Sequence, residues 1–182
     1  MAITLEQVRA ALEPEEPDYK KAAKNLGTEA LPHLERLITG DHPMLASKAA
    51  YLAGIIGTEQ SVSVLERAAR SGDASVRIAA AAAVQNLPPE PASDVLLRLI
   101  DDPDMGVQKV ALKSVHSNAS AALKARVEGL STAKTDTAIR SLSRETLSRM
   151  EASPGIQSEE KPSVKKRSSK KKAAGTKKRT KR

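Results

Sequence analysis

The apolar residues of this 182-residue chain recur at every third or fourth position, within segments that themselves repeat. Three such segments begin 31 residues apart and cover residues 45–57, 76–88 and 107–118. The segments that precede them keep the same step, with leucines at positions 34, 65 and 96. A period of this size that holds two amphipathic segments predicts stacked helix pairs, and therefore an all-α solenoid.

Capping residues, prolines and glycines predict where the helices begin and end. Thr4 and Gln7 fit a capping box at the start of the first helix, which the proline-rich residues 13–17 end. Pro32 places another helix start just before it, since proline is accepted in the first turn. We expect residues 88–91, which hold three prolines, to separate the third pair from the fourth. The five expected pairs cover residues 4–26, 28–57, 58–87, 92–118 and about 119–150.

The fifth pair is the most degenerate of the series. Its second helix is expected to bury the apolar residues Ile139, Leu142, Leu147 and Met150. The first pair is short, as expected of a terminal unit whose end faces water.

The apolar periodicity stops at residue 153, where Ser, Lys, Arg, Gly and Pro become dominant. Such a segment buries too little apolar surface to offset the entropy of ordering it. The sequence therefore predicts a helical domain over residues 1–152 and a disordered tail over residues 153–182.

The excess positive charge of the chain lies in this tail. Residues 153–182 carry 12 basic and 2 acidic side chains, a net charge of +10, whereas the whole chain carries +8 and residues 1–152 carry −2. The basic residues expected to contact phosphates are Lys165, Lys166, Arg167, Lys170, Lys171, Lys172, Lys177, Lys178, Arg179, Lys181 and Arg182. This pattern favours non-specific binding of DNA or RNA, which releases counterions and weakens steeply with salt. An acidic protein, an anionic membrane surface and a merely solubilising role are the alternatives.

The repeats resemble HEAT repeats, most closely the short bacterial type also found among phycobilin lyases. The resemblance covers residues 18–150 and rests on segments that open the second helix of a pair: DASVR (73–77), DMGVQ (104–108) and DTAIR (136–140). It implies a right-handed α–α solenoid, a superhelix like those of HEAT and armadillo proteins, with the second helices lining the concave side. The tail composition resembles linker-histone tails and the lysine-rich extensions of bacterial nucleoid proteins.

The Asp and Arg of these segments are predicted to be structural. Asp73 and Arg77, like Asp136 and Arg140, lie four residues apart at a helix start. The aspartate is expected to cap the helix and to meet the arginine of its own segment.

Aligning the second helices predicts a binding groove on the concave face. Its outward positions hold Lys21, Lys24, Tyr51, Ile55, Ile78, Lys109 and Lys113. An apolar centre flanked by lysines would suit a helix or peptide with acidic ends. The alternative is that Ile55 and Ile78 pack between repeats and that the lysines are ordinary solvated charges.

Little in the sequence points to catalysis. Cysteine is absent, which excludes disulfides and thiolate metal sites. His33, His42 and His116 lack metal-ligand spacing, and phosphate-binding glycine loops and nucleophile elbows are lacking. We expect no cofactor and no metal. The N-terminal residues do not resemble a signal peptide, and no apolar run is long enough to span a bilayer.

These observations favour a non-enzymatic adaptor that is cytoplasmic and associated with the nucleoid. We expect a monomer that binds a protein or peptide through its concave face, and DNA or RNA through its tail. One alternative is a HEAT-like enzyme, such as an alkyl-base DNA glycosylase or a bilin lyase. The absence of Trp and Phe argues against a glycosylase cleft. A protein-only scaffold with a solubilising tail is the other alternative.

Overall fold

The computed structural model describes residues 2–134 and 136–152, and the regular structure of these residues is entirely helical. The predicted all-α class is thereby confirmed for this part of the chain. The predicted tail, residues 153–182, lies outside the described residues. The α-helices are α1 (Leu5–Leu12), α2 (Tyr19–Leu26), α3 (Leu31–Ile38), α4 (Pro43–Ile56), α5 (Glu59–Ala68), α6 (Ala74–Ala83), α7 (Pro89–Leu99), α8 (Met105–Lys113), α9 (Ala121–Thr132) and α10 (Thr137–Ala152), with short 3-10 helices at Gly27–Ala30 and Val84–Asn86.

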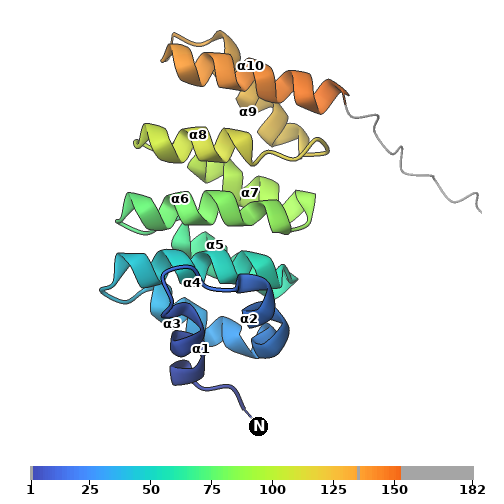
Figure 1. Ribbon diagram of the computed structural model, residues 1–182. Helices are drawn as coiled ribbons and strands as arrows, with labels where there is room; N and C mark the ends of the chain where they lie inside the picture. The colour runs from blue at the N-terminus through green and yellow to red at the C-terminus, as the bar shows by residue number, and fades with distance from the viewer. Residues whose placement is uncertain (1, 135, 153–182) are drawn as a thin grey trace, which may run out of the picture.

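The helices form two rows. In one row α2, α4, α6, α8 and α10 pack successively against each other, and in the other α3, α5, α7 and α9 do so. Figure 1 shows the first row in front, its helices stacked one above another, with the second row behind it. We call these the even row and the odd row. The helix α1 packs at the start of the stack, against α3 and α4.

Capping side chains fix the helix starts largely as predicted. Thr4 and Gln7 form the expected capping box, in which the Thr4 N–H donates to Gln7 Oε1 at 2.9 Å. Asp18 and Asp104 cap α2 and α8 by accepting backbone N–H groups at 3.0 Å. Pro32 lies in the first turn of α3, as expected.

The predicted boundary at residues 88–91 was placed too late. The third and fourth pairs are separated by Leu87 and Pro88, because α7 begins at Pro89 and includes Pro91 in its first turn. The first N–H groups of a helix have no intrahelical acceptor, so prolines there cost no hydrogen bonds. Pro88 takes the N-cap position with an extended backbone.

One apolar core runs through both rows, and small residues let the even row pack closely. Gly54 of α4 is buried, and a Cβ atom placed on it would lie 2.6 Å from both Cβ and O of Ala83. The run of alanines in α6 therefore permits the close approach of α4 and α6.

The buried stripe of α10 differs from the predicted one. Ile139 and Met150 are buried as expected. The buried side chains between them are those of Ser143 and Thr146, whereas Leu142 and Leu147 are only half-buried. Thr146 Oγ1 donates to the Leu112 carbonyl at 3.1 Å, and Ser143 Oγ donates to the Ile139 carbonyl at 2.8 Å. These hydrogen bonds make burial of the two hydroxyls tolerable.

Within the described part of the chain, the helices are too short or too polar for one to cross a bilayer.

Candidate protein-binding surfaces

The residues of the predicted groove lie on successive helices of the even row. Lys21 and Lys24 are on α2, Tyr51 and Ile55 on α4, Ile78 on α6, and Lys109 and Lys113 on α8. Since each of these helices packs against the next, the structure arranges the residues along one row. Binding of a partner to this row stays a prediction.

The apolar members of the row are involved in packing within the protein. The Tyr51 ring meets the Tyr19 ring edge to face, with centroids 4.8 Å apart and planes at 71°. Burial, together with the neighbouring Tyr51, raises the pKa of the Tyr19 phenol. Ile78 packs against the core, and its Cδ1 lies 3.5 Å from the position that a Cβ on Gly106 would take. For Tyr51 and Ile78, packing between helices is therefore part of their role.

The lysines of the row are more accessible than its apolar centre. Lys21, Lys24 and Lys113 are exposed and Lys109 is half-buried. Ile55 is also half-buried and does not belong to the residues that pack against the core. The accessible surface of the even row is thus mainly cationic on α2 and α8.

Arg77 does not pair with Asp73, which corrects the prediction. Its Nε and Nη2 donate to the carboxylate of Asp102, in the link between α7 and α8, at 2.7 and 3.0 Å. Its Nη1 donates to the Ser71 and Gly72 carbonyls at 2.9 and 3.2 Å. Asp73 still caps α6, as predicted, by accepting the Ser75 N–H.

The same segment of the fifth pair departs from the prediction in a similar way. Asp136 caps α10 through the Ala138 and Ile139 N–H groups, while Arg140 donates to Thr137 Oγ1 at 3.3 Å. Arg140 thus binds the hydroxyl of Thr137, the first residue of α10. The aspartates of both segments therefore keep their predicted capping role, and the arginines take other partners.

Asp102 is nearly enclosed, with 7% of its side chain exposed, against 13% for Arg77. Burial alone would raise the pKa of Asp102. The hydrogen bonds from Arg77 and from the Asp104 N–H, with the charge of Arg77, outweigh burial and lower that pKa below its ordinary value. The Asp102 carbonyl also accepts Gln108 Nε2 at 2.7 Å. Arg77 and Gln108, which occupy the same position of successive repeats, thus both bind the link after α7.

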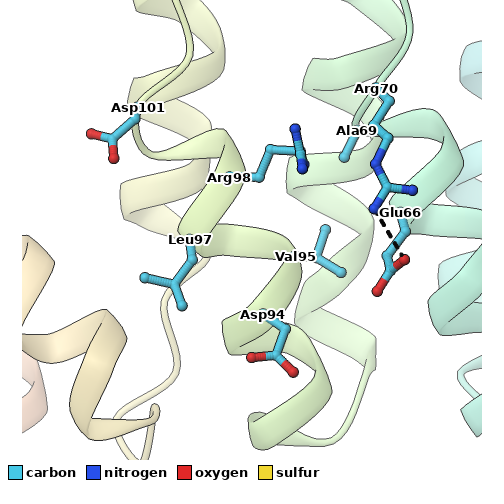
Figure 2. Close-up of a pocket in the computed structure, with 8 residues that line it drawn as sticks. All are labelled: Glu66, Ala69, Arg70, Asp94, Val95, Leu97, Arg98 and Asp101. Carbon is cyan, nitrogen blue, oxygen red and sulfur yellow. Dashed lines mark hydrogen bonds and ion pairs between the residues drawn. The ribbon is translucent and has the colours of Figure 1, made fainter.

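A cleft of about 450 Å³ lies in the odd row, between α5 and α7. Its residues are Glu66, Ala69, Arg70, Asp94, Val95, Leu97, Arg98 and Asp101. Figure 2 shows the Arg98 side chain pointing across the cleft toward Ala69 and Arg70, whereas Asp101 points away from it. Arg70 Nη2 lies 3.4 Å from Glu66 Oε2, and this exposed ion pair joins residues four positions apart.

An ion pair joins α3 to α5, but the equivalent ion pair between α5 and α7 is absent from the described residues. Arg67 of α5 lies 3.5 Å from Glu35 of α3. Arg98 of α7 and Glu66 of α5 stand 31 residues further along at the equivalent positions, but Glu66 pairs with Arg70 instead. Arg98 makes no hydrogen bond or ion pair to the part of the chain that the structure describes. The cleft lies where this cross-helix pair is absent.

The histidines form no common site. His33 Nε2 donates to the Ile3 carbonyl at 2.9 Å and so holds the N-terminal segment against α3, while His42 is exposed. His116 Nε2 is buried without a hydrogen-bond partner among the described residues. Among residues 2–134 and 136–152, no group of three or more His, Cys, Asp or Glu residues is placed to hold a metal ion.

The sequence analysis missed the odd-row cleft and its charged residues. The sequence signal of the cleft is modest. Glu66 with Arg70, at the end of α5, and Asp94 with Arg98, on α7, repeat an acid–base spacing of four residues. Such pairs are common on solvated helix faces, and only the packing of α5 beside α7 brings these two together.

The predicted phosphate-binding residues, Lys165 to Arg182, lie outside the described residues. No protein-family model matches this chain, and no curated protein sequence matches it.

Proposed function

We propose that the protein is a non-enzymatic adaptor, in which a HEAT-like solenoid binds a protein and a basic tail binds nucleic acid. The observation that carries this proposal is the separation of charge along the chain. Residues 153–182 carry +10, whereas residues 1–152 carry −2. A polycation of this density favours phosphate backbones without regard to base sequence.

The repeat of 31 residues and the two rows of helices support the solenoid part of the proposal. In such a fold each unit contacts mainly its neighbours, and the extended surface of one row serves for binding. A right-handed HEAT-type superhelix is the arrangement that these features favour.

The even row supports the choice of a protein partner. It offers the exposed Lys21, Lys24 and Lys113 on either side of the half-buried Tyr51 and Ile55. A helix or strand with acidic residues at both ends and apolar residues between them would match this order of charges. Exchanging the three exposed lysines for glutamate should abolish capture of such a partner without unfolding the protein.

Nucleic-acid binding is best tested with the full-length chain. In one variant, the eleven basic residues predicted to contact phosphates are replaced by glutamine, and duplex-DNA binding is measured over a series of salt concentrations. We expect the unmodified protein to bind with an affinity that falls steeply with salt, and the neutralised variant to bind far more weakly. Equal binding by both proteins would move the DNA site to the helical domain, and no binding by either would refute the nucleic-acid part of the proposal.

The enzymatic alternative is tested separately. Incubation with alkylated DNA or with a bilin would reveal base release or chromophore transfer, and either activity would replace the adaptor proposal. A protein-only scaffold would bind its partner in the same way but would show no salt-dependent association with DNA or RNA.

A further inference from the structure

We propose that the odd-row cleft between α5 and α7 binds an extended peptide segment with one basic and one acidic side chain two residues apart. This site lies on the other row of helices from the proposed groove. It goes beyond the proposed function and does not depend on the tail.

The charges in the cleft are ordered along its length. The acidic residues Glu66 and Asp94 also line an adjoining cleft of about 340 Å³, together with Glu59 and Pro91 at the helix starts. Arg70 and Arg98 also line another one, of about 490 Å³, near the ends of the same helices. The two helices therefore present an acidic end and an arginine end on the same sides of the cleft.

The two charged residues of α7 that line the cleft have no partners among the described residues. Asp94 and Arg98 make no hydrogen bond or ion pair within the described residues, although they lie four apart on α7. Figure 2 shows that Arg98 extends toward Ala69 and Arg70, which follow the end of α5, and away from Asp94. Arg98 has no carboxylate partner, so its guanidinium can bind one from a ligand in the cleft that Arg70 also lines. The opposing pair, Glu66 and Arg70, is half-exposed and therefore costs little to rearrange.

The spacing of these charges selects an extended ligand. Residues four apart on a helix are about 6 Å apart along its axis. In an extended chain, side chains two residues apart point to the same side and lie about 6.6 Å apart. One basic side chain can thus reach Glu66 and Asp94 while an acidic one reaches Arg70 and Arg98. Between them, the buried Ala69 and Val95 provide an apolar floor for the intervening backbone.

The mixture of charges argues against a nucleic-acid ligand. A phosphate backbone would meet Glu66 and Asp94 one turn away from the arginines, and like charges at that distance repel. A peptide with both signs satisfies each end. Direction along the cleft is left free by the charges, so Lys-x-Glu and Glu-x-Lys peptides fit in opposite orientations.

The test is a titration of the full-length, nitrogen-15-labelled protein with synthetic peptides, followed by amide NMR shifts. The probe is acetyl-Ala-Lys-Val-Glu-Ala-amide. Its control, acetyl-Ala-Lys-Glu-Val-Ala-amide, has the same composition, but places its charges on opposite faces of an extended chain. We expect saturable shifts at the Ala69 and Val95 amides with the probe and smaller, non-saturating shifts with the control.

Variants identify the residues responsible. R98Q should weaken probe binding roughly two- to five-fold, as should D94N, because exposed ion pairs contribute modestly. R67Q removes the arginine at the equivalent position of α5, which already pairs with Glu35, and should leave binding unchanged. Equal shifts with both peptides, or equal affinity of R98Q and the unmodified protein, would overturn the proposal. Saturable shifts confined to the even row would do so as well. The NMR spectrum of each variant reports at the same time whether it remains folded.

Discussion

Arg77 of α6 donates two hydrogen bonds to the carboxylate of Asp102, although the two residues are 25 positions apart in the sequence. The guanidinium also binds the carbonyls at the end of its own link, between α5 and α6. One side chain therefore joins the links inside two successive helix pairs, the α5–α6 link and the α7–α8 link. Any sliding of one pair over the next would break both hydrogen bonds to Asp102 together.

Replacing Arg77 by methionine should destabilise the protein by about 2–4 kcal/mol. The change keeps most of the apolar stem but leaves the nearly enclosed Asp102 carboxylate without its countercharge. Urea unfolding should show a lower midpoint with an unchanged slope. The control is R67M, because the Arg67–Glu35 pair is 3.5 Å long and both side chains are about half exposed. That variant should lose less than about 1 kcal/mol, and a comparable loss in both variants would mean that the Arg77 pair is no more important than a surface pair.

The stabilisation by Asp102 should depend on pH in the acid range. The folded protein holds the pKa of Asp102 below its ordinary value, so its carboxylate stabilises the fold above the unfolded pKa, near 4. That contribution is lost as the pH falls through the lower, folded pKa. The unfolding free energies of the native protein and of D102N should therefore differ by a constant amount from pH 7 to about pH 5 and converge at lower pH. A constant difference down to pH 2 would show that the Asp102 carboxylate gains nothing from its ionised form.

Replacing Gly54 by alanine should destabilise the protein by about 1–3 kcal/mol, against the helix propensity of alanine. The new methyl group would lie 2.6 Å from the Ala83 Cβ and carbonyl oxygen, so α4 and α6 would have to move apart. Gly129 of α9 is the matched control: it is exposed, and the nearest atom to a Cβ there is Arg126 Nη1 at 3.9 Å. G129A should raise the unfolding free energy by about 0.5–1 kcal/mol. Thermal unfolding of the two variants distinguishes these effects, and stabilisation by both would contradict the close packing of α4 and α6.

The sequence was sufficient for the helices because their ends are determined by neighbouring residues. Thr4, Asp73 and Asp104 each cap the helix that they were expected to begin. The same local rules are silent on contacts between repeats. The spacing within the segment predicted that Arg77 would pair with Asp73. Arg77 instead donates to Asp102 in the link after α7, a contact that no local pattern specifies.

The hydrophobic pattern also fails where hydroxyl groups replace apolar residues. Ser143 and Thr146 are as buried as the neighbouring Ile139, and a count of apolar residues passes over them. The Ser143 hydroxyl donates to the Ile139 carbonyl within α10, whereas the hydrogen bond from Thr146 to the Leu112 carbonyl becomes visible only when α10 is placed on α8. The odd-row cleft escaped notice for a related reason, since solvated ion pairs on single helices carry no sign of the helix that faces them.

Replacing Lys48 by methionine should loosen α1 without unfolding the rest of the protein. Lys48 of α4 donates from Nζ to the Leu12 carbonyl at 3.2 Å and to the Pro14 carbonyl at 2.6 Å. These are groups at and just beyond the end of α1, where backbone carbonyls have no partners within the helix and favour a cation. α1 is otherwise held mainly by the buried Val8 and Leu12. Loss of charged hydrogen bonds, each contributing about 1.5–3 kcal/mol, should therefore be concentrated in this one helix.

Hydrogen exchange measures this effect directly. In K48M, the amides of α1 should exchange at least about ten-fold faster, since about 1.4 kcal/mol of lost local stability corresponds to that factor. The amides of α6 and α8 should exchange at their original rates. K20M is the control, because Lys20 is exposed on α2 and makes no hydrogen bond or ion pair to the described residues. Unchanged exchange in α1 of K48M would show that apolar contacts alone hold the helix. Faster exchange throughout α4, α6 and α8 would instead mean that α1 is an integral part of the cooperative unit, and that the first pair is needed to terminate the stack.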